Sequence, residues 1–444
     1  MDEDRKTLVR GGLGLFTGRV PFVWLSNAFN NTGMEQKGTT INQVKDGQGN
    51  ILQYAPSLGQ YAKDPMGAMN SMSGSSAKPD IVTVDKDFKY PQVFRTNLAL
   101  EQMLPGDVKF TLEGIYSKTL HNVFFENLAL SNNGEKVYAI PGVEASAAPF
   151  YSFAKSDYYS IINLKNTNKG YTYAISGLLE KHFNFGLDLS GSYTFGHAKS
   201  VNDGTSSVAY SNWKYNYSID TNSDGELGFS KFDIPHRIML QASYTTPRYL
   251  NGWMATTISV IYNAFSGSRY SLTMNEGKND YNGDGWNGNN LLYIPTESEL
   301  QKIVNKDGKV VMTAEESRQA FGNWIENDSY AKNHRGQYAE RNSNLSDWEH
   351  QIDLHIAQDI FYLKERGSKI QVTFDVVNFT NMLNKKWGAS YSSAYNVSPL
   401  SVQSIATEAD GSRTPAYTYN SNNEVAKDDI ASRWHAQVGV RLTF

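Results

Sequence analysis

Cysteine is absent from the sequence of 444 residues. Its absence excludes disulfide bridges, thiolate metal sites and cysteine nucleophiles. An excess of charge of one sign is also lacking, because 41 lysine and arginine residues against 45 aspartate and glutamate residues leave a formal net charge of -4. A balanced charge gives no sign of a surface that binds nucleic acid or anionic lipid, so we expect no nucleic-acid partner.

Long hydrophobic runs are also missing, and none approaches the roughly 18 residues of a membrane helix. The mean hydropathy of -0.50 is that of a soluble protein. It does not exclude a membrane protein, because barrel strands alternate lipid-facing and lumen-facing residues and average out as polar. The 27 tyrosines and 36 glycines suit a barrel with long polar loops, and they equally suit a secreted β-sandwich.

An apolar secretion signal is not visible at the start. Residues 1–6 are acidic and then basic, and no apolar core follows them. Because a protein exported to the cell surface needs such a signal, we expect that it has been removed or that the chain begins partway through a longer protein.

Alternation with period two is the dominant pattern that is present. At the end of the chain, Ala436, Val438, Val440 and Leu442 share one face, and a charged Arg441 stands between two of them, which fits a strand and no amphipathic helix. The segments with this pattern are 6–16, 94–101, 108–117, 171–181, 187–195, 237–244, 254–264, 351–359, 369–379 and 434–444. They predict ten strands, each near the roughly 9–11 residues of a tilted membrane-spanning strand.

The connections between these strands alternate in length. The short ones are 104–107, 182–186, 246–252 and 362–368, and the long ones are 17–92, 118–170, 198–235, 265–348 and 380–433. Outer-membrane barrels have short periplasmic turns and long extracellular loops, whereas a soluble sandwich has no reason to keep this parity. We therefore predict an all-β fold, an antiparallel transmembrane β-barrel in contact with outer-membrane lipid. Helices are expected within one long loop, at 296–304 and 313–326.

Catalytic motifs are scarce. The sequence contains no G-x-S-x-G elbow and no H-E-x-x-H helix, and its eight histidines are scattered. Asp353 and His355 share the lumen face of one predicted strand. They fit either an acid–base pair at the rim of a barrel enzyme or ordinary lumen polarity, and we favour the second and expect no enzyme.

Two loops repeat the pattern D-x-N-x-D-G, through Asp220, Asn222 and Asp224 and through Asp280, Asn282 and Asp284. The pattern is typical of the front half of a calcium loop, with oxygen ligands at alternate positions and glycine at the turn. The bidentate glutamate of position twelve is missing, since Lys231 and Leu291 stand there. Calcium in these extracellular loops is one hypothesis, and simple turn formation by Asn, Asp and Gly is the other. No cofactor is required by the sequence.

Charged and aromatic side chains suggest binding surfaces without defining a ligand. Mixed charges on the predicted lumen face suit a plug domain or a polar solute. Aromatic residues in the long loops fit either a clamp for sugars or peptides or packing of the loops on one another, and we favour packing. The lumen charges are Arg95, Glu101, Lys109, Glu113, Asp188, Arg237, Asp353, Asp359, Asp375 and Arg441, and the loop aromatics include Trp24, Phe124, Phe125, Trp213, Tyr215, Tyr217, Trp286 and Trp324.

Several segments resemble the Oar-like branch of TonB-dependent transporters, which is related to the SusC-type receptors. They are residues 6–33 (KTLVRGGLGLFTGRVPFVWLSNAFNNTG), 97–128 (NLALEQMLPGDVKFTLEGIYSKTLHNVFFENL), 232–244 (FDIPHRIMLQASY), 279–295 (NDYNGDGWNGNNLLYIP) and 374–388 (FDVVNFTNMLNKKWG). The resemblance implies a 22-stranded barrel closed by an N-terminal plug, energised by the TonB complex through an N-terminal box, and often partnered by a surface lipoprotein. Residues 1–444 would then be the C-terminal part of the barrel, without plug domain, TonB box or signal peptide.

The resulting expectation is TonB-dependent transport of a large nutrient, an oligosaccharide or a peptide, across the outer membrane of a Gram-negative bacterium. In this interpretation the chain is about ten strands of a 22-stranded barrel and is inactive alone. The first alternative is a self-contained ten-strand outer-membrane barrel that acts as a rim enzyme or an adhesin. The second alternative is a soluble secreted β-protein.

Overall fold

The computed structural model describes residues 6–30, 44–45, 48, 51–53, 58–70, 78, 80–154, 157–307, 312–363, 368–392, 396–422 and 425–444. A 13-stranded sheet dominates it, and its main path runs β1-β5-β6-β12-β13-β15-β16-β21-β22-β27. These strands are β1 (Thr7–Thr17), β5 (Gln92–Leu104), β6 (Val108–Asn127), β12 (Tyr171–Phe183), β13 (Leu187–Ser200), β15 (His236–Thr245), β16 (Ala255–Phe265), β21 (Glu349–Leu363), β22 (Ser368–Val377) and β27 (His435–Thr443). Each overlaps one predicted strand, so all of the predicted strands are confirmed, in chain order along an antiparallel sheet.

The register of the sheet gathers the apolar residues of every strand on one side. Leu240 lies opposite Gly191 on β13 and opposite Tyr262 on β16. Leu354 lies in the same way between Val260 and Val376. Most of this face is not covered, since Leu240 is 48% and Val260 is 40% exposed, although Val376 is buried. A broad apolar face left open is what a strand array presents to lipid rather than to water.

The opposite side of the sheet is mainly polar. Hydroxyl pairs join neighbouring strands there, as between Ser176 and Thr194 at 2.9 Å and between Ser243 and Ser259 at 2.8 Å. The two faces alternate residue by residue because the side-chain period of a strand is two. The sheet therefore has one lipid-type face and one lumen-type face, as the alternation predicts.

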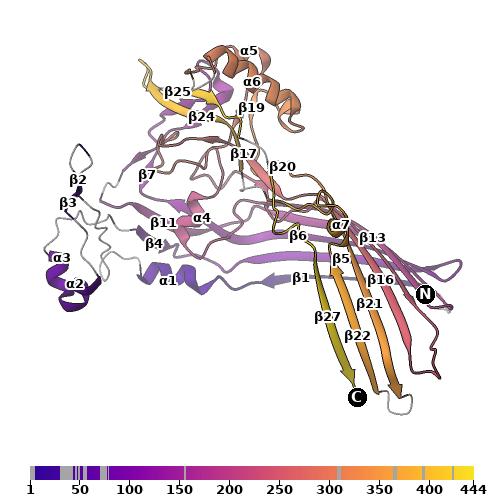
Figure 1. Cartoon of the computed structure of the whole chain (residues 1–444). Helices are drawn as coiled ribbons and strands as arrows, with labels where there is room; N and C mark the ends of the chain where they lie inside the picture. Colours follow the sequence, from indigo (N-terminus) through magenta and orange to yellow (C-terminus); the bar gives the residue numbers. More distant parts are fainter. Residues whose placement is uncertain are drawn as a thin grey trace.

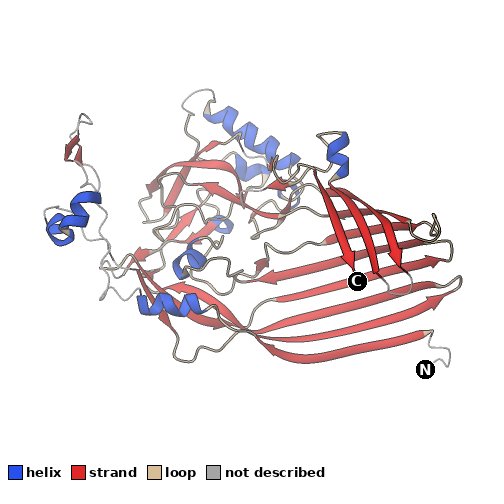
Figure 2. Ribbon diagram, turned by 60° about the horizontal axis from the view of Figure 1, so that its bottom comes forward, coloured by secondary structure: helices blue, strands red, loops and turns tan. Residues whose placement is uncertain are grey.

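The sheet is open in the part of the chain that the structure describes. The path ends at β1 on one side and at β27 on the other, and no ladder joins these two strands. Strong twist accompanies the open path, so that β1 and β27 run in clearly different directions (Figure 1). Both termini lie at the end of the strands opposite the long connections (Figures 1 and 2).

Four of the long connections fold together into a second body, which we call the loop lobe and define as the described residues of 118–170, 198–235, 265–348 and 380–433. A six-stranded sheet in it runs β20-β17-β24-β25-β8-β9. Its strands are β8 (Lys136–Tyr138), β9 (Ala147–Pro149), β17 (Arg269–Asn275), β20 (Asn344–Leu345), β24 (Asn396–Thr407) and β25 (Arg413–Tyr419). β6 and β13 also continue beyond their predicted ends into the lobe, where β11 (Ser160–Thr167) pairs with both β6 and β4 (Asp80–Val84). The sequence patterns did not predict this sheet.

Shorter strands and 3-10 turns complete the loop elements. The strands are β2 (Val44–Lys45), β3 (Ile51–Gln53), β4 (Asp80–Val84), β7 (Leu130–Ser131), β10 (Ser152–Phe153), β11 (Ser160–Thr167), β14 (Gly228–Phe229), β18 (Tyr293–Ile294), β19 (Gln337–Tyr338), β23 (Tyr391–Ser392) and β26 (Ala426–Lys427), and the turns are η1 (Glu144–Ser146) and η2 (Ala331–Asn333). Several form two-stranded ladders, as β18 does with β19.

The helices are short and belong to the long connections. They are α1 (Phe22–Asn30), α2 (Leu58–Lys63), α3 (Pro65–Asn70), α4 (Ala209–Lys214), α5 (Glu297–Leu300), α6 (Ala314–Asn327) and α7 (Phe379–Leu383). Capping boxes start α5 at Thr296 and α6 at Thr313, and both predicted helices are confirmed, although α5 ends earlier than predicted. Among the described residues, no helix is long and apolar enough to cross a membrane.

The buried core lies in the loop lobe, where residues of connection 17–92 such as Trp24 join it, and not against the large sheet. The largest fully buried side chains include Tyr281, Tyr417 and Phe321. Phe125 packs edge-on against Trp24 at 5.3 Å, and Trp213 is 2% exposed, so these loop aromatics serve packing as expected. An interior in the loops and an apolar exterior on the strands are the reverse of a soluble β-protein.

Candidate functional site

Ion pairs run across the polar face of the large sheet. Arg10 contacts Glu101 at 3.0 Å, and Lys109 lies 3.5 Å from both Glu101 and Glu180. His355 pairs with Asp375 on the neighbouring strand at 2.5 Å, while Asp353 accepts hydrogen bonds from Gln351 and from the Asn378 backbone. Asp353 and His355 therefore use different partners and do not form an acid–base pair with each other. The arrangement is that of a polar lumen wall.

A polar cavity of about 540 Å³ opens in the loop lobe. Its walls carry amides, hydroxyls, phenols and a few charges. The lining residues are Asn202, Asp203, Gly204, Thr205, Ser206, Ser207, Ser211, Asn212, Tyr215, Asn216, Tyr217, Lys231, Arg269, Arg341 and Asn342. Side chains of this kind exchange hydrogen bonds with a polar solute, and the volume is within the range of ligand sites.

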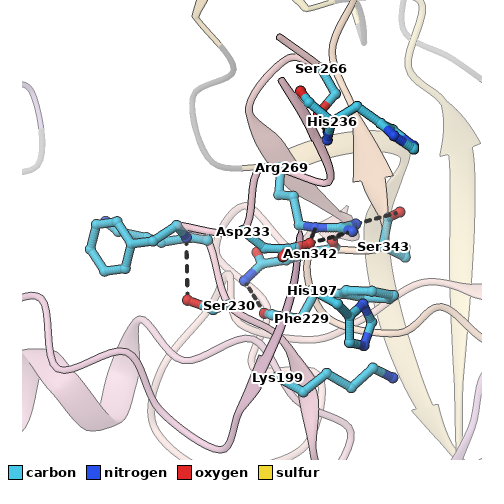
Figure 3. Close-up of polar contacts among 12 residues, drawn as sticks. His197, Lys199, Phe229, Ser230, Asp233, His236, Ser266, Arg269, Asn342 and Ser343 are labelled. Atoms are coloured by element: carbon cyan, nitrogen blue, oxygen red, sulfur yellow. Dashed lines mark hydrogen bonds and ion pairs between the residues drawn. The ribbon is translucent and has the colours of Figure 1, made fainter. Parts of the chain in front are cut away.

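Arg269, which lines this cavity, belongs to a buried ion pair. Arg269 and Asp233 are 7% and 3% exposed, and the Arg269 Nε and Nη2 atoms both lie 2.6 Å from Asp233 Oδ2. The Arg269 Nη1 atom donates to the Asn342 carbonyl at 3.0 Å, and the guanidinium lies 3.8 Å from the centre of the Phe229 ring (Figure 3). The carboxylate, the carbonyl and the aromatic ring together hold the Arg269 guanidinium in one position, so this part of the cavity wall is rigid.

A second buried arginine joins two loops beside the cavity. Arg341 is 5% exposed, and its guanidinium donates to the Asn216 side chain at 2.6 Å and to the Ser200 and Val201 carbonyls. Burial lowers the pKa of Arg341, and the nearby Asp203 and Glu226 carboxylates oppose that shift. Loops 198–235 and 265–348 are thus held together by charge-assisted hydrogen bonds.

The first D-x-N-x-D-G loop spreads its side chains in different directions. Asp220 accepts a hydrogen bond from the Tyr151 hydroxyl, and Asn222 pairs with the backbone of Asn127 at 2.9 Å in both directions. Asp224 turns towards Lys169 at 4.0 Å. The structure therefore does not bring Asp220, Asn222 and Asp224 together around one point.

Glu226 holds this first loop from its other end. Its carboxylate accepts hydrogen bonds from the Ile219 backbone at 3.0 Å and from the Asp220 backbone at 2.6 Å. Burial raises the pKa of Glu226 to about 7, against these hydrogen bonds and the attraction of Arg341. The Glu226 carboxylate thus accepts hydrogen bonds from the backbone of the first loop and holds that loop in place.

The second D-x-N-x-D-G loop gathers its side chains. Asp280 Oδ2 accepts from the Gly285 backbone at 2.8 Å, and the Asn282 amide lies 3.3 Å from Asp284 Oδ2. Asn282 and Asp284 are both 1% exposed. No group of three or more His, Cys, Asp or Glu side chains suited to a metal ion occurs in the part of the chain that the structure describes. Any ion in this loop would thus need amide, hydroxyl or backbone oxygens as well as the two carboxylates.

The open sheet with its apolar exterior, its polar inner face and its large loop lobe at one end defines the class of an outer-membrane β-barrel. Comparison with known proteins agrees: the family model of the outer membrane beta barrel domain matches residues 1–407, and the chain belongs to that family. No curated protein matches the chain.

A solved structure similar to this chain is that of the outer membrane transporter YddB from Escherichia coli. The two share 12% identity, the match covers 84% of this chain and 35% of that one, and the TM-score is 0.35. The chain thus spans about a third of the length of that transporter.

Sequence reasoning missed the residues that build the cavity wall. Asp233 and Arg269 are 36 positions apart, and Arg269 and Asn342 are 73 apart. No local spacing connects such residues. The available signal was weak: Asp233 stands in the segment FDIPHR, which leads into β15, and a charge that is buried there requires a partner.

Proposed function

We propose that this chain is the C-terminal part of a larger closed barrel that imports a large polar nutrient, an oligosaccharide or a peptide, with energy from TonB. The observation that carries the proposal is an open sheet with a lipid-type exterior and a polar cavity in the loop lobe at one end. The proposed location is the outer membrane of a Gram-negative bacterium, with the loop lobe outside the cell.

The unpaired edges support a larger barrel. β1 pairs only with β5, and β27 pairs only with β22, within the described residues. In lipid the backbone groups of the two free edges need partners, because the bilayer core supplies no hydrogen bonds. Closure on ten strands would need a β1–β27 ladder and would leave a narrow lumen. Strands from the rest of the protein that complete about 22 fit both the edges and a large solute.

The resemblance to Oar-like transporters supports the energy source and the partners. In this proposal an N-terminal plug fills the lumen and contacts the mixed charges of its wall, the TonB complex acts through an N-terminal box, and a surface lipoprotein covers the loop lobe. The polar cavity between loops 198–235 and 265–348 contacts the nutrient on its way to the lumen. No catalytic role is proposed for any residue, and no cofactor is required for transport.

Uptake in cells tests this function. We expect cells to take up a labelled oligosaccharide or peptide through the full-length protein, and uptake to stop when either the gene or TonB is removed. Ser207 is exposed and lines the cavity, so Ser207→Trp fills the opening and should reduce uptake to the level of the deletion strain.

The matched control is Val208→Trp, because Val208 is the next residue, is 42% exposed and does not line the cavity. This variant should transport like the wild type. Uptake that persists without TonB would contradict a transporter that takes its energy from TonB. Equal uptake by both tryptophan variants would show that the nutrient does not contact the cavity on its way to the lumen.

A further inference from the structure

Residues 280–285, the second D-x-N-x-D-G loop, form a tight turn. The Asp280 carboxylate accepts the Gly285 backbone N–H at 2.8 Å, which closes the loop on its first residue. Gly283 and Gly285 have φ of 74° and 84°, a region that other residues rarely adopt. In the first loop Gly225 donates instead to the Ser223 hydroxyl at 3.1 Å. The two loops therefore share a sequence pattern and differ in conformation.

Two buried oxygens beside this loop have no hydrogen-bond partner. One is Asp280 Oδ1, the carboxylate oxygen that the Gly285 N–H leaves free. The other is the hydroxyl of Thr221, a residue that is 7% exposed and comes from the neighbouring loop; this hydroxyl lies close to the Asp284 carboxylate but does not have hydrogen-bond geometry to it. Buried oxygens without a partner are rare, and each calls for an explanation such as an ion or a water molecule.

Asp284 interacts with both residues, since the Asp280 carboxylate and the Thr221 side chain each act on its carboxylate. Its Oδ1 accepts from the Trp286 backbone at 2.7 Å, and its Oδ2 accepts from the Asn289 amide at 3.0 Å. Asp284 also lines a cavity of about 280 Å³, so there is space next to the carboxylate.

We propose that Asp280, Asn282 and Asp284, together with Thr221 from the neighbouring loop, bind one calcium ion. Oxygen ligands alone favour a hard cation, and a flexible set of carboxylate, amide, hydroxyl and backbone oxygens suits calcium better than the strict octahedron of magnesium. The carbonyl of Trp286, at position seven of such a loop, completes the ligands together with water. The first D-x-N-x-D-G loop supplies Thr221 and binds no ion of its own.

The ion would fasten the parts of the loop lobe that surround it. The Tyr151 backbone donates to the Asn282 carbonyl at 2.7 Å, which joins loop 118–170 to the site. Trp286 meets Tyr215 edge-on at 5.5 Å, and Tyr215 lines the polar cavity. Calcium at this loop therefore stabilises a wall of the cavity, although binding of the ion does not depend on the transport function.

Terbium luminescence measures the site directly in the full-length protein in detergent. Tb³⁺ replaces calcium in oxygen sites, and Trp286 at the loop should sensitise its emission. We expect calcium to displace Tb³⁺ with a dissociation constant on the order of 10⁻⁴–10⁻³ M, as in extracellular modules, and equal magnesium to displace little. Asp280→Asn and Asp284→Asn should each weaken calcium binding roughly tenfold or more, because each removes a ligand charge.

Asp224→Asn is the matched control, since it makes the same change at the same position of the first loop, and it should bind calcium like the wild type. Hydrogen exchange of the wild type, with and without calcium, gives a readout that does not depend on how the variants fold: residues 276–291 should become protected. Absence of calcium binding by the wild type at millimolar concentrations would overturn the proposal. Calcium binding that survives in Asp280→Asn and Asp284→Asn would overturn this location.

Discussion

Leu240→Arg should destabilise the protein in the membrane by about 2–4 kcal/mol, the cost of an arginine that faces lipid near the bilayer midplane. Leu240 lies in the middle of β15, on the apolar face, with Gly191 and Tyr262 as its neighbours on the adjacent strands. Its side chain is 48% exposed in the isolated sheet, so arginine meets no steric obstacle. The expected loss therefore comes from placing a charge in lipid, and urea unfolding from lipid bilayers measures it.

Gln241→Arg provides the control for this measurement. Gln241 is the next residue on β15 and is also exposed, but it points to the polar face, opposite Ser190. Arginine there reaches the aqueous lumen, and we expect stability close to that of the wild type. Equal destabilisation by the two variants would show that the faces have been assigned wrongly.

Asp233→Ala should cost about 3–5 kcal/mol, because it leaves the Arg269 guanidinium buried without its counter-charge. The Asn342 carbonyl and the Phe229 ring stay in place but carry no negative charge to replace the carboxylate. The loss should appear in the loop lobe and not in the large sheet. Urea titration with hydrogen exchange read separately for the lobe and the strands distinguishes the two.

Two control variants set the scale for the stability that Asp233→Ala should lose. Asp233→Asn keeps an oxygen acceptor for Arg269 and should cost less than Asp233→Ala. Glu315→Ala removes an exposed partner of Arg318, at 2.9 Å, and should change stability by about 0–1 kcal/mol. A loss for Asp233→Ala no larger than that for Glu315→Ala would mean that the buried pair does not hold the cavity wall.

The strands of the large sheet could be predicted because their signal is local. Each strand carries its own alternation, and the short turns, as between Leu104 and Val108, fix which strand comes next. The register follows, since a slip of one residue would turn every apolar side chain away from lipid. The helices at Thr296 and Thr313 were equally readable from their capping boxes.

The loop lobe could not be predicted because its pairings are distant in sequence. β17 pairs in parallel with β24, and Thr273 bonds Ser398 across 125 positions. β25 reaches β8 in the same way, with Arg413 opposite Val137. β17 and β25 are seven residues long and buried over most of their length, so they lack the alternation that marks a strand with one open face.

The candidate metal site could likewise be predicted only in part, because its motif is local in sequence and its partners are distant. The pattern D-x-N-x-D-G occurs twice, and the sequence gives no reason to prefer one copy. Partners that are distant in sequence make the two copies different. Asn127 and Trp213 donate hydrogen bonds to the Asn222 side chain, whereas the Asn282 amide lies beside Asp284. The partner hydroxyl of Thr221 was likewise unpredictable, because it comes from the other loop.

Cysteine labelling on intact cells tests the membrane topology most directly, and the chain has no cysteine to obscure it. Ala409 is exposed between β24 and β25 in the loop lobe, and Asn184 is exposed in the short turn between β12 and β13. We predict that Ala409→Cys in the full-length protein reacts with a membrane-impermeant maleimide on intact cells, and that Asn184→Cys reacts only after lysis. Labelling of both positions on intact cells, or of Asn184→Cys alone, would contradict strands that cross the outer membrane with the loop lobe outside.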